Sequence, residues 1–218
     1  MAERRRRSRW VARGAAAVAA LALLAVPGRA PATIAEQRAR LPPPAQCGDD
    51  IVQGVWKSHK YDQRFGEWVI FTLEIHRLAD DRSRLVGKIG NHSWTGGPQQ
   101  QEPPPCDPGV FQWIIETDAE GSVDSTGHIR FHGVGQWRLV QRVCPTNLWS
   151  GYNLDNFDGM IDTQLNEFQT HNNDGGRDVN EPYVFRRIDC FPEGSEFHPR
   201  VVAQPPPFYP DRSGCSCL

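Results

Sequence analysis

Alternating apolar and polar positions run through the middle of the chain and predict β-strands. The clearest example is the segment 69–76, in which Val, Phe, Leu and Ile occupy every second position, so a strand there would carry four apolar side chains on one face. The same alternation, or enrichment in β-branched and aromatic residues, predicts strands at 51–56, 84–91, 110–117, 128–132, 136–143, 157–162 and 183–188. Turn-forming residues lie between them, at 64–66, 79–81, 120–121, 133 and 172–176. Only the segment 163–169 has a helix-like pattern, for one or two turns.

Strands joined in sequence order by short connections tend to pair with their neighbours, and about eight of them can close into a barrel. We therefore expect an all-β fold, an antiparallel up-and-down barrel of about eight strands, with a β-sandwich as the alternative. The barrel domain would span residues 47–191, a common size for one domain. Residues 33–46 and 192–218 each contain three consecutive prolines and no apolar periodicity. They predict a disordered, extended N-terminal linker and a disordered, proline-rich C-terminal tail.

The first 32 residues have the three zones of a secretory signal peptide. Six arginines lie within residues 4–13, an apolar run extends from Ala15 to Val26, and Ala30-Pro31-Ala32 supplies small residues for cleavage. The apolar run has 12 residues, whereas a membrane-spanning helix needs about 20. We therefore expect residues 1–32 to be removed and the mature protein to be secreted, either to the periplasm or to the extracellular space.

Removal of the signal peptide makes the protein acidic. Seven of the 24 basic and one of the 26 acidic side chains lie in residues 1–32, so the mature chain has a formal net charge of −8. Such a surface repels phosphate backbones, and no cluster of Lys and Arg remains to offset this. We expect no nucleic-acid partner. We also expect no membrane span, because nothing after Val26 is long and apolar enough. The oligomeric state cannot be deduced from the sequence.

All six cysteines lie in the mature chain, and an even number in an exported protein favours disulfides. In an up-and-down barrel with an even number of strands, the first strand lies beside the last. Cys47 precedes the first predicted strand and Cys190 follows the last, so we predict that they pair across the closure seam. Cys106 and Cys144 flank two strands that can form a hairpin, and we predict a second disulfide between them. The remaining two cysteines would form a strained Cys-x-Cys bridge or an intermolecular link; they are Cys215 and Cys217.

Gly54-Val55-Trp56 on the first predicted strand resembles the Gly-x-Trp signature that opens lipocalin-type and avidin-type (calycin-like) barrels. The resemblance implies that Trp56 closes one end of the barrel. It also implies that Arg186 or Arg187, on the last strand, packs on that tryptophan. Thr117-Asp118 resembles part of a second lipocalin motif, but the tyrosine that the motif requires does not follow. The resemblance supports a barrel and says nothing about which ligand it binds.

Aromatic residues are the main candidates for ligand binding. Trp56, Trp113 and Trp137 fall on predicted strands, where packing is the expected role. Trp94 and Trp149 lie beside glycine-rich loops, where aromatic side chains more often contact a ligand. The candidate ligand-binding residues are Trp94, Trp149, Tyr152 and Trp113.

The segment 171–181, with sequence HNNDGGRDVNE, is rich in oxygen-bearing side chains of the kind that bind calcium. Its spacing matches neither an EF-hand loop nor a glycine-rich nonapeptide repeat, and the same residue types suit a solvated turn. We therefore predict neither a metal site nor any other cofactor. The residues that would serve if calcium did bind are Asp174, Asp178, Asn180 and Glu181.

No Gly-x-Ser-x-Gly motif and no catalytic cysteine motif is present, so the sequence favours a binding protein over an enzyme and predicts no catalytic residue. Carboxylates that could serve a glycosidase-like hydrolase are Glu116, Asp118, Asp158 and Asp162. Asn91-His92-Ser93 fits the N-glycosylation sequon. The leading hypothesis is a secreted, non-catalytic barrel that binds a small apolar or sugar-like ligand. The alternatives are a secreted carboxylate-dependent hydrolase and a purely structural extracellular protein.

Overall fold

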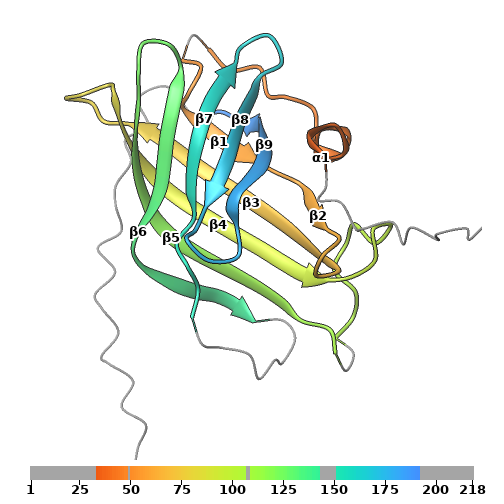
Figure 1. Ribbon diagram of the computed structural model, residues 1–218. Helices are drawn as coiled ribbons and strands as arrows, with labels where there is room; N and C mark the ends of the chain where they lie inside the picture. The colour runs from red at the N-terminus through yellow and green to blue at the C-terminus, as the bar shows by residue number, and fades with distance from the viewer. Residues whose placement is uncertain (1–32, 49, 107–108, 143–150, 192–218) are drawn as a thin grey trace, which may run out of the picture.

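The computed structural model describes residues 33–48, 50–106, 109–142 and 151–191, which form one helix and nine strands (Figure 1). The elements in chain order are α1 (Ile34–Arg40), β1 (Gly54–Lys57), β2 (Lys60–Asp62), β3 (Glu67–Arg77), β4 (Arg84–Thr95), β5 (Gln112–Val123), β6 (His128–Arg142), β7 (Asn156–Asp162), β8 (Glu167–Asn173) and β9 (Val179–Asp189). The described residues lie between the segments expected as signal peptide and tail. Those two segments, 1–32 and 192–218, are outside the described part of the chain.

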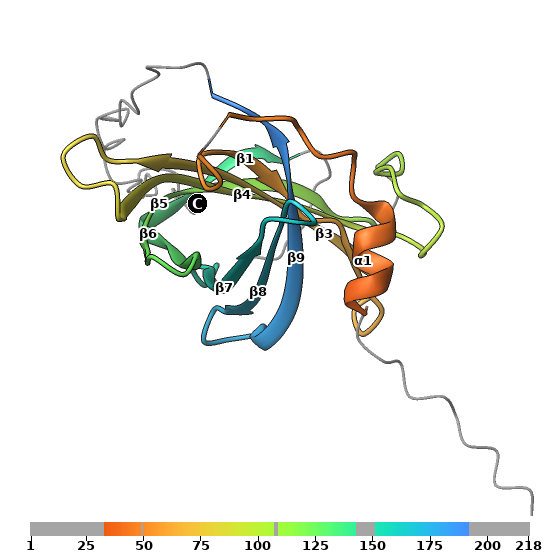
Figure 2. The same cartoon turned by 90° about the horizontal axis from the view of Figure 1, so that it is seen from above.

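Eight strands close into an antiparallel barrel, as predicted. From β3 to β9 each strand pairs with the next along the chain, and β1 pairs with both β9 and β3 to complete the ring. β2 lies outside the ring and pairs only with the start of β3. Figure 2 views the barrel from above, where β6 to β9 curve round to meet the flatter wall of β1, β3, β4 and β5.

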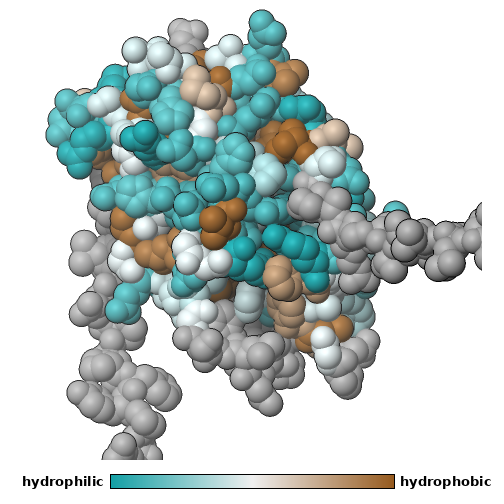
Figure 3. All heavy atoms as spheres, viewed as in Figure 1, coloured by the Kyte–Doolittle hydropathy of each residue, from teal (hydrophilic) through white to brown (hydrophobic). Residues whose placement is uncertain are grey.

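The alternation in β3 determines which side chains fill the barrel. Val69, Phe71, Leu73 and Ile75 are each at most 1% exposed and belong to one apolar core with residues from the other strands. Aromatic rings fill much of its centre: the Phe157 ring lies 5.1 Å from the Phe71 ring and 5.0 Å from the Phe185 ring, between centroids. The visible outer face is mainly hydrophilic, with apolar residues in small separate groups (Figure 3). The period-two pattern therefore separates the interior of the barrel from its surface.

The first and last strands meet around Trp56, which is fully buried. Trp56 is opposite Arg187 in the β1–β9 pairing, and the Arg187 guanidinium carbon lies 5.5 Å from the centroid of the Trp56 ring system. Gly54 has a φ of 141°, and a Cβ there would lie 2.6 Å from the Asp189 carbonyl oxygen. Glycine is thus required at this position because the chain of β9 passes too close for any side chain. Of the two predicted arginines, Arg187 is the one that packs on Trp56.

A disulfide between Cys47 and Cys190 links the two ends of the barrel domain, as predicted. Cys106 is also disulfide-bonded, but its predicted partner Cys144 lies outside the described residues. So do Cys215 and Cys217.

The linker expected at residues 33–46 is not simply extended, because it contains α1. Thr33 starts the helix with a capping box, in which Glu36 and Thr33 satisfy each other's backbone N–H groups. Gln37 is fully buried; its side chain donates to the Pro182 carbonyl oxygen at 2.9 Å and accepts from the Val184 N–H at 3.2 Å. The prediction of an extended linker was wrong because it was based on the lack of apolar periodicity. This helix is held to β9 by a polar side chain instead.

Three further predictions in the second half of the chain are wrong. The segment 163–169, expected as a short helix, is a turn followed by the start of β8. Residue 133, expected as a turn, lies inside the 15-residue strand β6, and the turn expected at 120–121 lies inside β5. Gly121 has to be glycine for another reason: a Cβ there would lie 2.0 Å from the Arg130 carbonyl oxygen. Glycine marks close strand packing as well as turns.

No helix in the described residues is long and apolar enough to cross a membrane.

Candidate functional site

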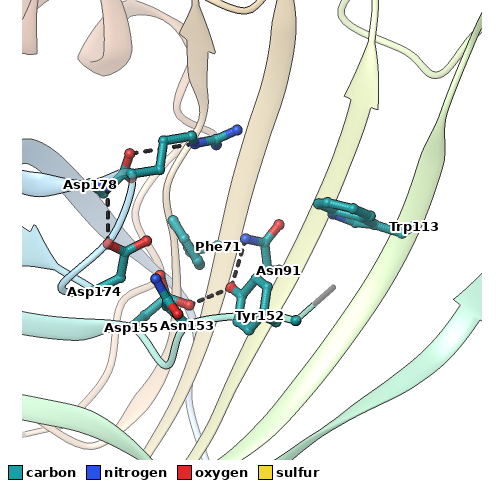
Figure 4. A pocket seen from close by; sticks show the side chains of 10 residues that line it. Phe71, Asn91, Trp113, Tyr152, Asn153, Asp155, Asp174 and Asp178 are labelled. Carbon is teal, nitrogen blue, oxygen red and sulfur yellow. Dashed lines mark hydrogen bonds and ion pairs between the residues drawn. The ribbon is translucent and has the colours of Figure 1, made fainter. Parts of the chain in front are cut away.

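A pocket of about 370 Å³ lies beside the segment that leads into β7, with Tyr152 and Trp113 among its lining residues. β6 pairs with β5 as far as Arg142, but with β7 only over residues 128–132. The segment 151–155, which leads into β7, lines the pocket together with β3, β4, β5 and the β8–β9 loop (Figure 4). Phe71 and Trp113 contribute aromatic surface, and most of the other lining side chains are polar.

A continuous chain of hydrogen bonds crosses the pocket. The Ser93 hydroxyl donates to Asn91 Oδ1 at 2.6 Å, and Asn91 Nδ2 donates to the Tyr152 hydroxyl oxygen at 2.9 Å. The Tyr152 hydroxyl donates in turn to Asp155 Oδ2, while Asn172 Nδ2 donates to Asp155 Oδ1 at 2.7 Å. Two of these bonds join different elements: Asn91–Tyr152 links β4, and Asn172–Asp155 links β8, to the segment before β7. The network therefore fixes the side chains against one another; Figure 4 shows its central part, Asn91, Tyr152 and Asp155.

Burial raises the pKa of the Asp155 carboxyl group to about 7. The hydrogen bonds from Tyr152 and Asn172 oppose this shift, and the negative charges of Asp178 and Asp174 add to it. Burial also raises the pKa of the Tyr152 hydroxyl well above its ordinary value, with a further contribution from Asp155. At neutral pH Tyr152 is therefore a proton donor in this network, and Asp155 is close to the midpoint of its titration.

A cluster of buried ion pairs forms the wall beside the pocket. Lys60 Nζ lies 2.7 Å from Glu181 Oε1, with both side chains at most 9% exposed. The Arg64 guanidinium holds Asp62 through two hydrogen bonds, of 3.0 and 2.7 Å, and lies 3.4 Å from Glu181. The two pairs that involve Glu181 connect the β2–β3 region with β9, across more than a hundred residues of sequence. Removing one partner of such a pair leaves an uncompensated buried charge, at a cost of about 3–5 kcal/mol.

The β8–β9 loop joins this cluster to the pocket. Arg177 pairs with Glu67 of β3 and its guanidinium carbon lies 4.8 Å from the centroid of the Phe65 ring. Asp178 is 3% exposed and accepts a hydrogen bond from the Tyr183 hydroxyl at 2.8 Å. Burial raises the pKa of the Glu67 carboxyl, and the Arg177 charge opposes that shift. The loop is thus held to the rest of the barrel through Arg177 and Asp178.

The predicted ligand-binding residues are divided between two faces of the barrel. Tyr152 and Trp113 line the pocket. Trp94 is buried on the outer face, where its ring lies 6.1 Å from the Trp68 ring in a cluster with Tyr61. Trp149 lies outside the described residues. Neighbouring positions of a strand face opposite sides of the sheet, so a glycine-rich loop beside Trp94 was not enough to locate its side chain.

The calcium candidates do not share one site. Asp174 and Asp178 line the pocket. Glu181 is committed to Lys60, and Asn180 lies in a separate polar groove with His171. Within the described residues, no group of three or more His, Cys, Asp or Glu side chains is arranged to hold a metal ion.

The carboxylates predicted for hydrolysis lie away from the pocket. Glu116 and Asp118 are both bound by Arg138 on β6. Asp158 accepts from Arg130 at 3.0 Å and is half exposed. None of these residues, nor Asp162, lines the pocket with Asp155.

Asn91 and Asp155 were missed as site residues. Asn91 is 6% exposed and bonded on both sides, whereas a glycosylated asparagine must be accessible at the surface. Its position gave a usable signal, because Asn91 lies two residues after Ile89 and therefore shares the inward face of β4. Asp155 carried no comparable signal, since it precedes β7 in an irregular segment.

Comparison with known proteins gave no match to a family model, a curated protein or a solved structure.

Proposed function

We propose that this barrel binds a small sugar-like molecule in the pocket lined by Tyr152 and Trp113. The observation that carries the proposal is the combination of an aromatic side chain, Trp113, with the hydrogen-bond chain through Asn91, Tyr152 and Asp155. A sugar ring has C–H groups on its faces and hydroxyls at its edges, so it requires both kinds of surface. Closely packed rings occupy the apolar part of the interior, which supports a polar ligand over an apolar one.

The disulfide between Cys47 and Cys190 supports an exported protein, because such bonds persist in oxidising compartments. With the signal-peptide pattern of residues 1–32, it favours a binding protein that acts in the periplasm or outside the cell. The binding function itself is non-catalytic.

The test is calorimetric titration of the protein with a panel of hexoses and hexosamines, for wild type and for Tyr152→Phe. Loss of the hydroxyl breaks the link between Asn91 and Asp155 and should weaken binding about tenfold, the equivalent of one hydrogen bond. Tyr61→Phe is the matched control, because Tyr61 lies in the outer cluster and its substitution should leave affinity unchanged. If no member of the panel binds, the proposed function is wrong and a purely structural role becomes the better account.

A hydrolase is the second candidate, supported by the pKa of Asp155 near 7 and by Asp178 in the same pocket. A carboxyl group that is about half protonated at neutral pH is suited to act as a general acid. In this case the protein should release 4-nitrophenol from a 4-nitrophenyl glycoside, and Asp155→Asn should abolish the reaction. If wild type is inactive on α- and β-linked hexosides across pH 4–8, the hydrolase candidate fails while sugar binding is unaffected.

A further inference from the structure

The pocket contains more acidic than basic side chains. Asp155, Asp174 and Asp178 line it with a single cation, Arg177. The Arg177 guanidinium is already paired with Glu67, and its Nε lies 3.8 Å from Asp178 Oδ1. The negative charge of the pocket is therefore not balanced by a cation directed at its centre.

Asp178 has an oxygen that the protein leaves without a donor. Its Oδ2 accepts from Tyr183, but Oδ1 is buried and accepts no hydrogen bond in the described part of the chain. The nearest cationic nitrogens, of Arg64 and Arg177, both lie 3.8 Å from Oδ1. A buried carboxylate oxygen normally has a hydrogen-bond donor, so a ligand with a strong donor would satisfy it.

The other two pocket carboxylates are held by neutral donors. Asp155 accepts from Tyr152 and Asn172. Asp174 accepts from two backbone N–H groups of its own loop, at 2.6 and 3.0 Å. Among the described residues neither carboxylate is in an ion pair. Asp174 therefore has no counterion in this partly enclosed site and attracts a cation, whereas Asp155, with a pKa of about 7, carries only part of a charge at pH 6.5.

We propose that the ligand carries a protonated amine, so that an amino sugar is bound in preference to its neutral counterpart. This inference rests on the proposed sugar-binding function and specifies its ligand. The amine faces the Asp178 carboxylate while the indole ring of Trp113 packs against the sugar ring. Aromatic faces also attract ammonium groups. An amine fits better than a metal ion because no metal-binding group of three side chains exists in the described residues.

The experiment compares matched sugars that differ only at one nitrogen: glucose, glucosamine and N-acetylglucosamine, with the corresponding galactose and mannose series, titrated at pH 6.5. We expect the free amine of at least one series to bind about 10- to 100-fold more tightly than its neutral relatives, the range that one charge-assisted hydrogen bond provides. If neutral sugars bind equally well or better, the amine inference is wrong while the proposed function stands. If no sugar binds, both fail.

Variants determine whether the preference arises from the carboxylates. Asp178→Asn should reduce the preference for the amine about tenfold, because it removes the charge that the amine faces. Asp174→Asn is a second variant, for the case that Asp178→Asn does not fold. The amide oxygen of the new asparagine can still accept the two hydrogen bonds from the loop backbone. The same loss of preference for the amine is expected. Asp80→Asn makes an identical change of charge at an exposed residue and should change nothing. An unchanged preference in both pocket variants would overturn the inference.

Discussion

The buried carboxyl group of Asp155 should make the stability of the protein depend on pH in a specific direction. Its pKa is raised from 3.8 to about 7 in the folded state, so between these values the folded protein binds a proton that the unfolded chain releases. Stability contributed by the neutral carboxyl is fully present below pH 3.8 and is lost as pH rises through 7. Integrating the two titrations between pH 5 and pH 8 gives a loss of about 2.5 kcal/mol.

Asp155→Asn isolates this contribution, because the amide is uncharged at every pH and keeps the shape of the side chain. Unfolding by urea, followed by tryptophan fluorescence at pH 5, 6, 7 and 8, gives the free energy of unfolding of both proteins. We expect the variant to gain about 2.5 kcal/mol relative to wild type between pH 5 and pH 8. Other titrating groups affect both proteins alike and cancel in the difference. A constant difference across this range would refute the argument, since Asp155 would then have an ordinary pKa.

Three further changes test the fold. Replacing Cys47 and Cys190 by serine should lower the free energy of unfolding by about 4–5 kcal/mol, as expected for so long a loop, measured by urea denaturation against the oxidised wild type. Gly87→Ala should destabilise the folded protein by about 3 kcal/mol or more, because its Cβ would lie 1.7 Å from a carbonyl oxygen of β3. Gly97→Ala is the control: its Cβ would meet nothing within 4 Å, so the thermal midpoint should not change. Gln37→Leu should cost about 2 kcal/mol by leaving two polar backbone groups of β9 unpaired beneath α1; equal thermal midpoints for variant and wild type would show that α1 does not contribute to stability.

The barrel could be predicted because it follows from a pattern of apolar and polar residues within single strands. Inward-facing residues of β3 recur every second position, and the same rhythm predicted the adjacency of the first and last strands. The count of eight agrees because two errors compensate: the expected strands 128–132 and 136–143 are one strand, β6, and β8 was missed. That adjacency led to the disulfide between Cys47 and Cys190. The contact of Arg187 with Trp56 followed from the Gly-x-Trp resemblance, although the contact alone does not establish a relationship to lipocalin-type or avidin-type barrels.

The site could be predicted only in part because it depends on contacts between residues that are far apart in the chain. Tyr152 and Trp113 were identified from residue type, but Tyr152 acts through Asn91, which is 61 residues away in the chain. The Lys60–Glu181 pair spans 121 residues, and no periodic pattern connects its partners. Polar side chains inside the barrel break the rule that inward positions are apolar. Only the closed structure shows which hydrogen-bond or ion-pair partner each of them has.

The central claim, that the pocket lined by Tyr152 and Trp113 is a ligand site, is tested most directly by two-dimensional ¹H–¹⁵N NMR during titration with the sugar and amino-sugar panel. We predict that the side-chain amide signals of Asn91 and the indole signal of Trp113 shift together and saturate with the same affinity. The indole signal of Trp94, on the outer face, should not move. Shifts confined to Trp94 and its neighbours, or an unchanged spectrum with every sugar, would contradict the account.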